Sequence, residues 1–459
     1  MNLFRATDGY KIGHWRQLLS GTQYSYGYGM PRHKTASTVV WGMNEIAQKL
    51  SVSCRPYYIK EFEDLVAEGY GPSYNKEGFD LLSKVYGEDT QELPILFRGL
   101  EDGTVVAPGT PHYTLVNTDP RFPWLPGILE SVILRDAWYG STVATISYEC
   151  RQIILDALRL SGTPEDIDYK LVDFGLRGVS SGESSALGGA GHGISFRSSD
   201  NTEALSYIKE NYYDHQAFVT LNASEHSTVT QGGREGEKAF YKRFIKTELR
   251  PGVSAACVSD SYDIWEALKM WKSLEPDIKQ SGGTLIVRPD SGDPVTTPVE
   301  VVQQLIVLFG STVNDKGYMV LPDHIRVIQG DGVNTGSIED ILDLLHFNNI
   351  SSDNISFGMG GELLQKGDRD RYKWSYKCSS TCVDGIWSDV YKDPIDSAKR
   401  SLRGLVTDGD KHDEDQALRH EPATKSHFVT HYNGELGYLR SPDQWEVIRA
   451  RSGARENSA

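Results

Sequence analysis

The sequence contains little cysteine, and its cysteines are not spaced for cross-linking or metal binding. Five occur among 459 residues, at Cys54, Cys150, Cys257, Cys378 and Cys382. The number is odd and no CxxC pair occurs, which argues against a disulfide scaffold and against a structural zinc site. Thiols that remain reduced fit the cytoplasm, and we therefore expect a cytoplasmic protein.

Long apolar runs and an excess of positive charge are also lacking. No apolar run approaches the roughly 20 residues that a membrane span requires, and the amino-terminal MNLFRATDGYK has no signal-peptide core. Lysine and arginine number 47 against 63 acidic residues, so the formal net charge is −16. We expect neither a membrane nor a nucleic-acid partner, because coating a phosphate backbone needs clustered basic residues. One small basic pocket for a phosphorylated metabolite remains compatible with this balance.

The chain does contain enough apolar sequence for a large core. Hydrophobic residues make up 39% and charged residues 24%, and the length suits about two or three ordinary domains. Residues 1–150 mix helical and strand-like segments, and the pattern returns to strands near the carboxyl end. We predict that residues 1–150 and 375–459 together form an α+β domain, with residues 151–374 as a second domain.

The segment 151–374 repeats one pattern: a short apolar run, a polar loop and, in most cases, a helix. Strand, loop and helix in this repetition predict an α/β fold, an irregular (β/α) barrel or a closely related parallel sheet. Functional residues of such a fold lie in the loops that follow the strands. The apolar runs lie within residues 169–178, 193–201, 217–227, 255–263, 284–292, 325–333 and 354–361.

The stretch AFVTLNASEHSTVTQGG, residues 217–233, organises the rest of this segment. Its first residues predict a strand, which then delivers Glu225 and His226 side by side. We interpret His226 as the reactive residue. The alternative is a histidine that merely satisfies hydrogen bonds at a strand end. Glu225 is the weaker candidate, because alternation along a strand points it away from the face of His226.

The other strand-end loops supply groups that could bind a phosphorylated sugar and a flat base. Phe174 and Arg177 place an aromatic face beside a guanidinium, a pair suited to a heterocycle and an anion. Each such loop by itself is often only a turn, so the prediction of a shared site depends on the loops meeting at one barrel mouth. The further candidates are the charged residues Asp200, Asp260, Arg288, Asp290 and Asp331, and the glycines Gly330, Gly360 and Gly361, whose backbone N–H groups can approach a phosphate.

With these motifs in this order, the chain resembles the nicotinamide phosphoribosyltransferase family of the type II phosphoribosyltransferase fold. The resemblance implies transfer of phosphoribosyl from phosphoribosyl pyrophosphate to nicotinamide, giving nicotinamide mononucleotide and pyrophosphate in NAD salvage. It also implies Mg²⁺, ATP hydrolysis through a phosphohistidine, and a homodimer with shared active sites. The matching segments cover nearly the full length: TDGYKIGHWRQ, DFGLRGVSS, SEHSTVT, VSDSYDIW, IVRPDSGDP, RVIQGDGV, SFGMGGELLQKGDRD, YKCS and KDP.

The resemblance assigns a role to each strand-end residue. His226 matches the histidine that ATP phosphorylates, and Asp260 is the candidate that orients it. Phe174 matches a residue on one face of the nicotinamide ring, and Asp200 matches the acceptor of the carboxamide NH₂. The other matches are Arg177 and Arg288 around pyrophosphate and base, Asp290 beside the ribose, where it could stabilise oxocarbenium-like charge, Gly330 and Asp331 at the ribose hydroxyls, and Gly360 and Gly361 at the 5′-phosphate.

Residues outside the barrel segment complete the match. By resemblance, Tyr10 supplies the second face of the nicotinamide ring from the partner subunit, and Asp8 beside it is a further substrate-binding candidate. No Mg²⁺ ligand is assigned. Four basic residues match positions that reach phosphates, several of them from the second subunit: Arg32, Arg369, Lys377 and Lys392.

Two departures and two alternatives accompany this prediction. Glu362 stands where the family has a third glycine, and Leu176 stands where it has an aromatic residue.

A nicotinate phosphoribosyltransferase is the alternative within the class, and Asp200 disfavours it because a nicotinate carboxylate would meet a like charge. A non-catalytic nucleotide sensor is the alternative outside the class. The joint presence of His226, Asp200, Arg288 and Asp290 argues against it.

Overall fold

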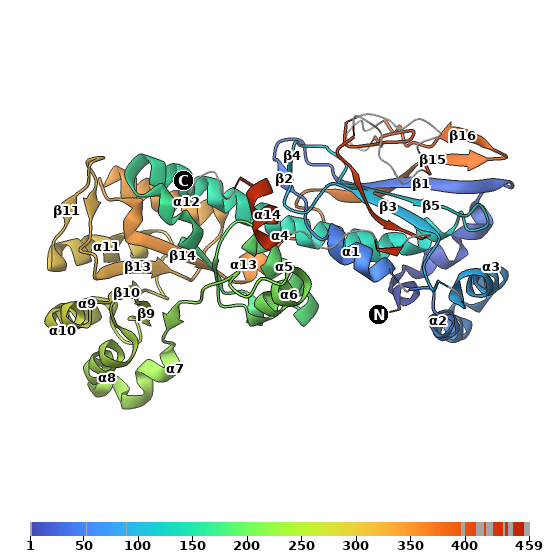
Figure 1. The fold of residues 1–459 in the computed structure, drawn as a ribbon. Coiled ribbons are helices and arrows are strands. Elements are labelled where there is room, and N and C mark those ends of the chain that lie inside the picture. The colour runs from blue at the N-terminus through green and yellow to red at the C-terminus, as the bar shows by residue number, and fades with distance from the viewer. Residues whose placement is uncertain are drawn as a thin grey trace. The chain divides into compact units, whose positions relative to one another are not determined.

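The computed structural model describes residues 2–51, 53–88, 90–395, 400–409, 417–418, 426–434, 437–438 and 444–453 (Figure 1). The chain divides into two compact units. Unit 1 comprises residues 1–142 and 368–443, and unit 2 comprises residues 143–367 and 444–459. Both expected types of architecture are present, an antiparallel α+β unit and a parallel α/β unit.

Unit 1 is built on a seven-stranded sheet in the order β16-β15-β1-β5-β3-β17-β18. All its neighbouring strands pair antiparallel, and a separate ribbon pairs β2 with β4. The strands are β1 (Thr22–Pro31), β2 (Thr38–Val39), β3 (Ile95–Gly99), β4 (Val105–Val106), β5 (Tyr113–Asn117), β15 (Trp374–Val383), β16 (Ile386–Asp389), β17 (Val429–Asn433) and β18 (Gly437–Tyr438).

Helices cover this sheet through one large apolar cluster that includes Met43, Phe62, Phe79 and Leu115. Three of these helices lie between residues 43 and 82, within the region of mixed helical and strand-like segments. Pro56 begins the second because its missing N–H costs nothing in a first turn. The α-helices are α1 (Met43–Leu50), α2 (Pro56–Gly69), α3 (Lys76–Leu82) and α4 (Leu125–Ser161), with shorter helical turns at η1 (Leu3–Ala6), η2 (Gly9–Gln17), η3 (Gly71–Ser73) and η4 (Ser83–Gly87).

Unit 2 contains a curled, seven-stranded parallel sheet in the order β7-β6-β14-β13-β10-β9-β8. The two ends of this order meet, because a parallel bridge joins Ser198 of β7 to Val219, just before β8. The neighbours around the sheet therefore follow the chain order, as the repeated pattern predicts for a (β/α) barrel. The strands are β6 (Leu171–Asp173), β7 (Ser198–Ser199), β8 (Asn222–Ala223), β9 (Ser254–Val258), β10 (Thr284–Arg288), β13 (Ile325–Gln329) and β14 (Ile355–Met359).

Helices alternate with these strands along the chain (Figure 1). Several begin at clear caps: the Asn201, Asp263 and Asn334 side chains accept backbone N–H groups at the starts of α6, α9 and α12. The α-helices are α5 (Gly182–Gly193), α6 (Thr202–Tyr212), α7 (His226–Val229), α8 (Gly233–Glu248), α9 (Ile264–Ser273), α10 (Glu275–Ser281), α11 (Thr296–Phe309), α12 (Thr335–Phe347), α13 (Gly361–Leu364) and α14 (Trp445–Arg451). Minor elements are η5 (Pro164–Tyr169), η6 (Leu176–Gly178), η7 (Thr230–Gly232), η8 (Ser352–Asn354) and the hairpin β11 (Thr312–Val313) with β12 (Met319–Val320).

The carboxyl-terminal helix α14 groups with unit 2, whereas the sequence pattern assigned residues 375–459 as a whole to the α+β domain. Arg449 explains the difference. Its buried guanidinium donates to the carbonyl oxygens of Gly193 at 2.6 Å and Phe196 at 3.1 Å, and to Asp168 at 3.0 Å. Because all three acceptors lie in unit 2, these hydrogen bonds fix α14 to that unit. The two remaining unit boundaries lie within α4, between residues 142 and 143, and before β15, between residues 367 and 368.

In the described part of the chain, no helix combines the length and the apolar character needed to cross a membrane.

A buried histidine predicts how the stability of the barrel unit depends on pH. His192 Nε2 donates to the Ser198 carbonyl oxygen at 3.2 Å, and Nδ1 accepts from Ser147 Oγ at 3.0 Å. Burial lowers the pKa of His192 to about 4. The unfolded chain therefore binds the extra proton, and stability is lost as pH falls from about 6.5 toward 4. His192→Gln should flatten the decline of the thermal midpoint over this range, whereas His215→Gln at an exposed site should not. An unchanged slope in His192→Gln would contradict this account.

Candidate functional site

Alternation along the strands places the candidate residues at the mouth of the barrel. Val172, Ala256, Ile286 and Ile328 form a buried cluster, with Phe174 packed against it. Strand side chains repeat their direction every two residues. Residues two positions beyond this cluster therefore also point inward, but at the carboxyl ends of the strands. Phe174, Arg288 and Gly330 hold such positions.

These inward positions and the loops beyond them line one cavity of about 530 Å³ in unit 2. The structure brings together nine residues singled out from the sequence, from loops that are far apart along the chain. Leu176 and Gly178 also line the cavity. The nine are Phe174, Arg177, Asp200, Arg288, Asp290, Gly330, Asp331, Gly360 and Gly361.

The Phe174 ring is held by glycines on neighbouring strands. A methyl group added to Gly358 would overlap Phe174 Cε2, and one added to Gly330 would approach the same atom at 3.3 Å. The Arg288 guanidinium lies over the ring, with its carbon 5.4 Å from the centroid. Gly358 was not among the predicted site residues, because it acts only by leaving room for a neighbour.

Acidic and basic groups at the ends of β9 and β10 form one network. Arg288 donates from Nε at 3.0 Å and from an Nη at 2.6 Å to Asp290 Oδ1. Asp260 Oδ2 accepts from the Asp290 backbone N–H at 3.0 Å and from Ser291 Oγ at 2.5 Å. The two strand-end loops are therefore tied together. The other Asp260 oxygen, Oδ1, is buried and has no hydrogen-bond partner.

His226 lies against this network. It begins α7 directly after β8, and its Nδ1 is 3.0 Å from Ser261 Oγ. On the opposite side of the ring, Nε2 lies 3.6 Å from Asp260 Oδ1 and 3.6 Å from Asp290 Oδ2. The imidazole is 46% exposed and Asp260 only 4%, so the ring has an open side for a reactant. Ser261, next to the predicted Asp260, is a contact that the sequence did not single out.

Glu225 does not continue a strand, as the sequence pattern assumed, but takes the N-cap position of α7. Its carboxylate accepts from Ser227 Oγ. The chain has already turned at this point, so the direction of Glu225 is set by the helix start rather than by strand alternation.

Asp200 follows β7 and faces the same cavity. Its Oδ1 accepts from Thr220 Oγ1 at 2.7 Å, and its backbone N–H donates to the Asp173 carbonyl at 3.0 Å. Burial raises the pKa of the Asp200 carboxyl, and the hydrogen bonds and Arg288 oppose the shift. Beneath it, burial raises the pKa of Asp173 to about 6.

A second group of predicted residues lies in unit 1. Asp8 takes the N-cap position of η2 without capping it, and its carboxylate instead accepts from Ser131 Oγ at 2.5 Å. Tyr10 is 68% exposed and packs edge-on against His14, with ring centroids 4.9 Å apart. Its exposed ring is available for stacking.

Basic residues gather in the same unit. Burial lowers the pKa of Lys377, and the charges of Arg32, Lys392 and Lys11 lower it further, against the opposing effect of Glu130. Arg32, Lys377 and Lys392 are the predicted phosphate-binding residues among these charges. Arg369, exposed, lies 3.6 Å from Asp370.

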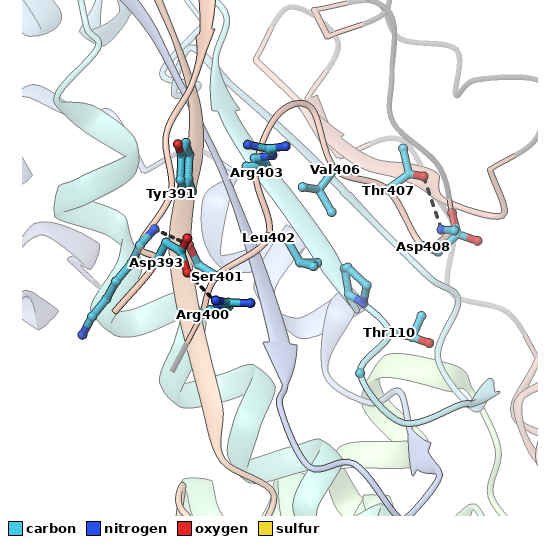
Figure 2. Close-up of a pocket in the computed structure, with 14 residues that line it drawn as sticks. Thr110, Tyr391, Asp393, Arg400, Ser401, Leu402, Arg403, Val406, Thr407 and Asp408 are labelled. Atoms are coloured by element: carbon cyan, nitrogen blue, oxygen red, sulfur yellow. Dashed lines mark hydrogen bonds and ion pairs between the residues drawn. The ribbon is translucent and has the colours of Figure 1, made fainter. Parts of the chain in front are cut away.

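Lys392 also lines a cavity of about 820 Å³ within unit 1. Figure 2 shows this cavity with Arg400 beside Asp393 and with Arg403 three residues further along the same stretch. Arg400 and Arg403 add positive charge there, and the sequence analysis named neither of them.

The structure shows the surroundings of Glu362 and Leu176, the two departures from the family pattern. Glu362 forms an ion pair with Lys366, one turn later, at 2.5 Å, so its charge is compensated beside the Gly360–Gly361 loop. Leu176 lines the mouth of the unit 2 cavity and is 36% exposed.

Two family models match the chain. The nicotinate phosphoribosyltransferase (NAPRTase) family matches residues 169–425, and the amino-terminal domain of nicotinamide phosphoribosyltransferase matches residues 2–95. A nicotinamide phosphoribosyltransferase of Xanthomonas campestris pv. campestris (strain 8004) is 42% identical over 419 residues, covering 88% of this chain and 87% of that relative. The chain belongs to the nicotinamide phosphoribosyltransferase family.

Further members and solved structures extend this comparison. The family member of that name from Acinetobacter baylyi (strain ATCC 33305 / BD413 / ADP1) is 28% identical over 453 residues, 88% of each chain. Human nicotinic acid phosphoribosyltransferase has a TM-score of 0.61 at 14% identity, over 99% of this chain and 94% of that one. Nicotinate-nucleotide pyrophosphorylase from Pyrococcus furiosus has a TM-score of 0.59 at 14% identity, over 100% and 96%. These two structures show the shared fold.

The glycine beneath Phe174 gives the first test of the site. Gly358→Ala should push the Phe174 ring into the cavity, because a methyl group at this position overlaps the ring. The displaced ring would fill space in the cavity, so KM for the base substrate should rise at least about tenfold, while overpacking should lower stability by about 1–3 kcal/mol. Gly236→Ala, on α8 with no atom within 4 Å of the added methyl, should leave KM unchanged. Steady-state kinetics decide, and an unaltered KM in Gly358→Ala would show that the ring position does not matter.

Proposed function

We propose that this enzyme transfers the phosphoribosyl group of phosphoribosyl pyrophosphate to nicotinamide in NAD salvage, and that it couples the transfer to ATP hydrolysis through a phosphohistidine at His226. Membership of the family supports the first part. The observation that carries the second is the imidazole of His226, open on one side and placed beside Asp260, Asp290 and Ser261.

The cavity suits a flat base linked to a phosphorylated sugar. Phe174 stacks on the nicotinamide ring, and Asp200 accepts a hydrogen bond from the carboxamide NH₂. Nicotinate would place its carboxylate against Asp200, so like charges repel and the amide is preferred. Asp290 faces the ribose, where its charge stabilises the oxocarbenium character that develops as the bond to pyrophosphate breaks.

The remaining residues of the cavity divide between ribose and phosphates. Gly330 and Asp331 face the ribose hydroxyls, and Gly360 and Gly361 offer backbone N–H groups to the 5′-phosphate. Arg177 and Arg288 supply guanidinium groups for the pyrophosphate and the base.

His226 takes the γ-phosphoryl group of ATP in this proposal. A neutral imidazole nitrogen attacks phosphorus, an N–P bond forms, the bond to the β–γ bridging oxygen breaks, and ADP leaves. Ser261 Oγ, 3.0 Å from Nδ1, holds the ring in place, and Asp260 and Asp290 lie 3.6 Å from Nε2. Water later attacks the phosphohistidine and releases phosphate, so the energy of ATP favours product formation.

Mg²⁺ fits the acidic residues of the network. Among the described residues, no group of three or more His, Cys, Asp or Glu side chains is arranged to hold a metal ion. Mg²⁺ carried by phosphate substrates needs only one or two carboxylates, and the unpaired Asp260 Oδ1 with Asp290 Oδ2 offers such a pair. Bound there, the ion would neutralise charge on the departing pyrophosphate.

The unit 1 residues support a homodimer with shared sites. Tyr10 presents an exposed ring, and the charges of Arg32 and Lys392 lower the pKa of Lys377. Unit 1 thus offers a second stacking face and basic residues for phosphates. We assign these groups to the active site of the partner subunit. All five cysteines are free thiols, which supports a reducing compartment, and we propose the cytoplasm.

His226→Ala tests the phosphohistidine. Because the nucleophile is gone, ADP release should fall at least about 1000-fold, and the yield of nicotinamide mononucleotide should no longer respond to ATP. The measurements are ADP release and product yield, each with and without ATP and Mg²⁺. Transfer of label from γ-labelled ATP to the protein provides the direct readout.

His215→Ala, at an exposed histidine that does not line the cavity, is the matched control and should retain ATP coupling. If His226→Ala still gained product yield from ATP, the assigned nucleophile would be wrong. A wild-type enzyme that formed product from neither base would overturn the function itself.

Complementation tests the shared site. Tyr10→Ala and Asp290→Ala chains should each be nearly inactive alone. In a shared arrangement, random pairing makes half of the dimers mixed, each with one intact site of two, so coexpression should restore about 25% of wild-type activity. The double variant on a single chain, coexpressed with an Asp290→Ala chain, should restore none. No recovery in the first mixture, with dimers present, would place each site within one chain.

A further inference from the structure

The barrel of unit 2 closes through a very short ladder beside Asp200. Val219 donates its backbone N–H to the Arg197 carbonyl at 2.7 Å, and its own carbonyl accepts from Ser199 N–H at 3.2 Å. This ladder, which we call the closing seam, joins β7 to the segment that enters β8. Asp200 is the first residue past the seam on one side, and Thr220 is the first on the other.

Side-chain bonding continues where the backbone ladder stops. Thr220 Oγ1 donates to Asp200 Oδ1 at 2.7 Å, and the Leu221 backbone also hydrogen-bonds this carboxylate. The Asp200 backbone is meanwhile held by β6, through its N–H donated to the Asp173 carbonyl at 3.0 Å. One strand thus anchors the main chain of Asp200, and the other anchors its side chain.

These donors have two effects on the carboxylate. They fix its rotation, so its remaining lone pairs keep one direction within the cavity; a carboxylate has about four such acceptor sites. They also stabilise the ionised form against the desolvation that burial imposes. Both effects matter for discrimination, because only an ionised, fixed carboxylate both accepts from an amide NH₂ and repels a carboxylate.

We propose that Thr220 is a positioning residue that sets the preference for the amide base over the corresponding acid by holding Asp200. The proposal rests on the proposed function, since it concerns the base that this site takes. Thr220 acts through Asp200 and touches no reacting atom.

The charged groups around Asp200 determine the expected pH behaviour. Asp173 lies below it, Arg288 faces it from β10 and lowers its pKa, and Arg177, Asp290 and Asp331 line the same cavity. Loss of the Thr220 hydroxyl removes a donor to the ionised form and leaves these charges unchanged. The carboxyl should therefore protonate at higher pH in Thr220→Val, and a protonated Asp200 no longer repels nicotinate.

The test compares Thr220→Val, Thr220→Ser and wild type with nicotinamide and with nicotinate, between pH 5.5 and 8. Because the carboxylate loses the donor that fixes its rotation, KM for nicotinamide should rise at least about tenfold in Thr220→Val, with kcat within about twofold. The ratio of kcat/KM for nicotinamide to kcat/KM for nicotinate should also fall about tenfold. The acid limb of the nicotinamide profile should move to higher pH. Thr220→Ser, which keeps the hydroxyl, should have the wild-type KM for nicotinamide, the wild-type ratio of kcat/KM between the two bases and the wild-type acid limb.

Thr247→Val, which makes the same change on exposed α8 where the hydroxyl bonds only its own helix, should match wild type throughout. A wild type that prefers nicotinamide, with Thr220→Val unchanged in KM and in pH profile, would overturn the role of Thr220 alone. Equal loss of kcat and thermal stability in Thr220→Val and Thr220→Ser would also overturn it. A wild type that turned over neither base would instead overturn the proposed function.

Discussion

Parallel pairing is the constraint on which the rest of this structure depends. Because every strand of the unit 2 sheet runs the same way, all carboxyl ends meet at one edge. Alternation then decides which residues point inward there. The cluster of Val172, Ala256, Ile286 and Ile328 fills the interior, and the next inward positions belong to the cavity. The same hydrogen-bonded ladders therefore fix both the core and the geometry of the site.

The charges at this edge hold one another in place. Arg288 is bonded to Asp290, Asp290 to Asp260 through its backbone, and Asp260 and Asp290 face His226. Opposite charges lie close enough to offset the desolvation of each, which a lone buried carboxylate could not do. His226 is held by groups from two other strand ends. Its orientation is consequently a property of the barrel rather than of its own short helix.

Much of this arrangement was predictable from the sequence. Buried parallel strands appear as short apolar runs, and the residues that follow each run reach the mouth. Phe174, Asp200 and Asp290 were found this way. Residues that act through a neighbour carry no such signal. Thr220, Ser261 and Gly358 look like ordinary strand and turn residues until the fold places them against Asp200, His226 and Phe174. The position of α14 was missed for a similar reason, since its docking depends on the buried Arg449.

At the closing seam, the backbone pairing that closes the barrel does not depend on burial of the β8 side chains. β7 and β8 are two residues each, and the side chains of β8 are exposed rather than packed in the core. Substitutions in β8 therefore disturb few apolar contacts, whereas changes in β10 or β13 would disrupt the interior. Backbone hydrogen bonds, rather than a packed apolar core, hold this side of the barrel closed.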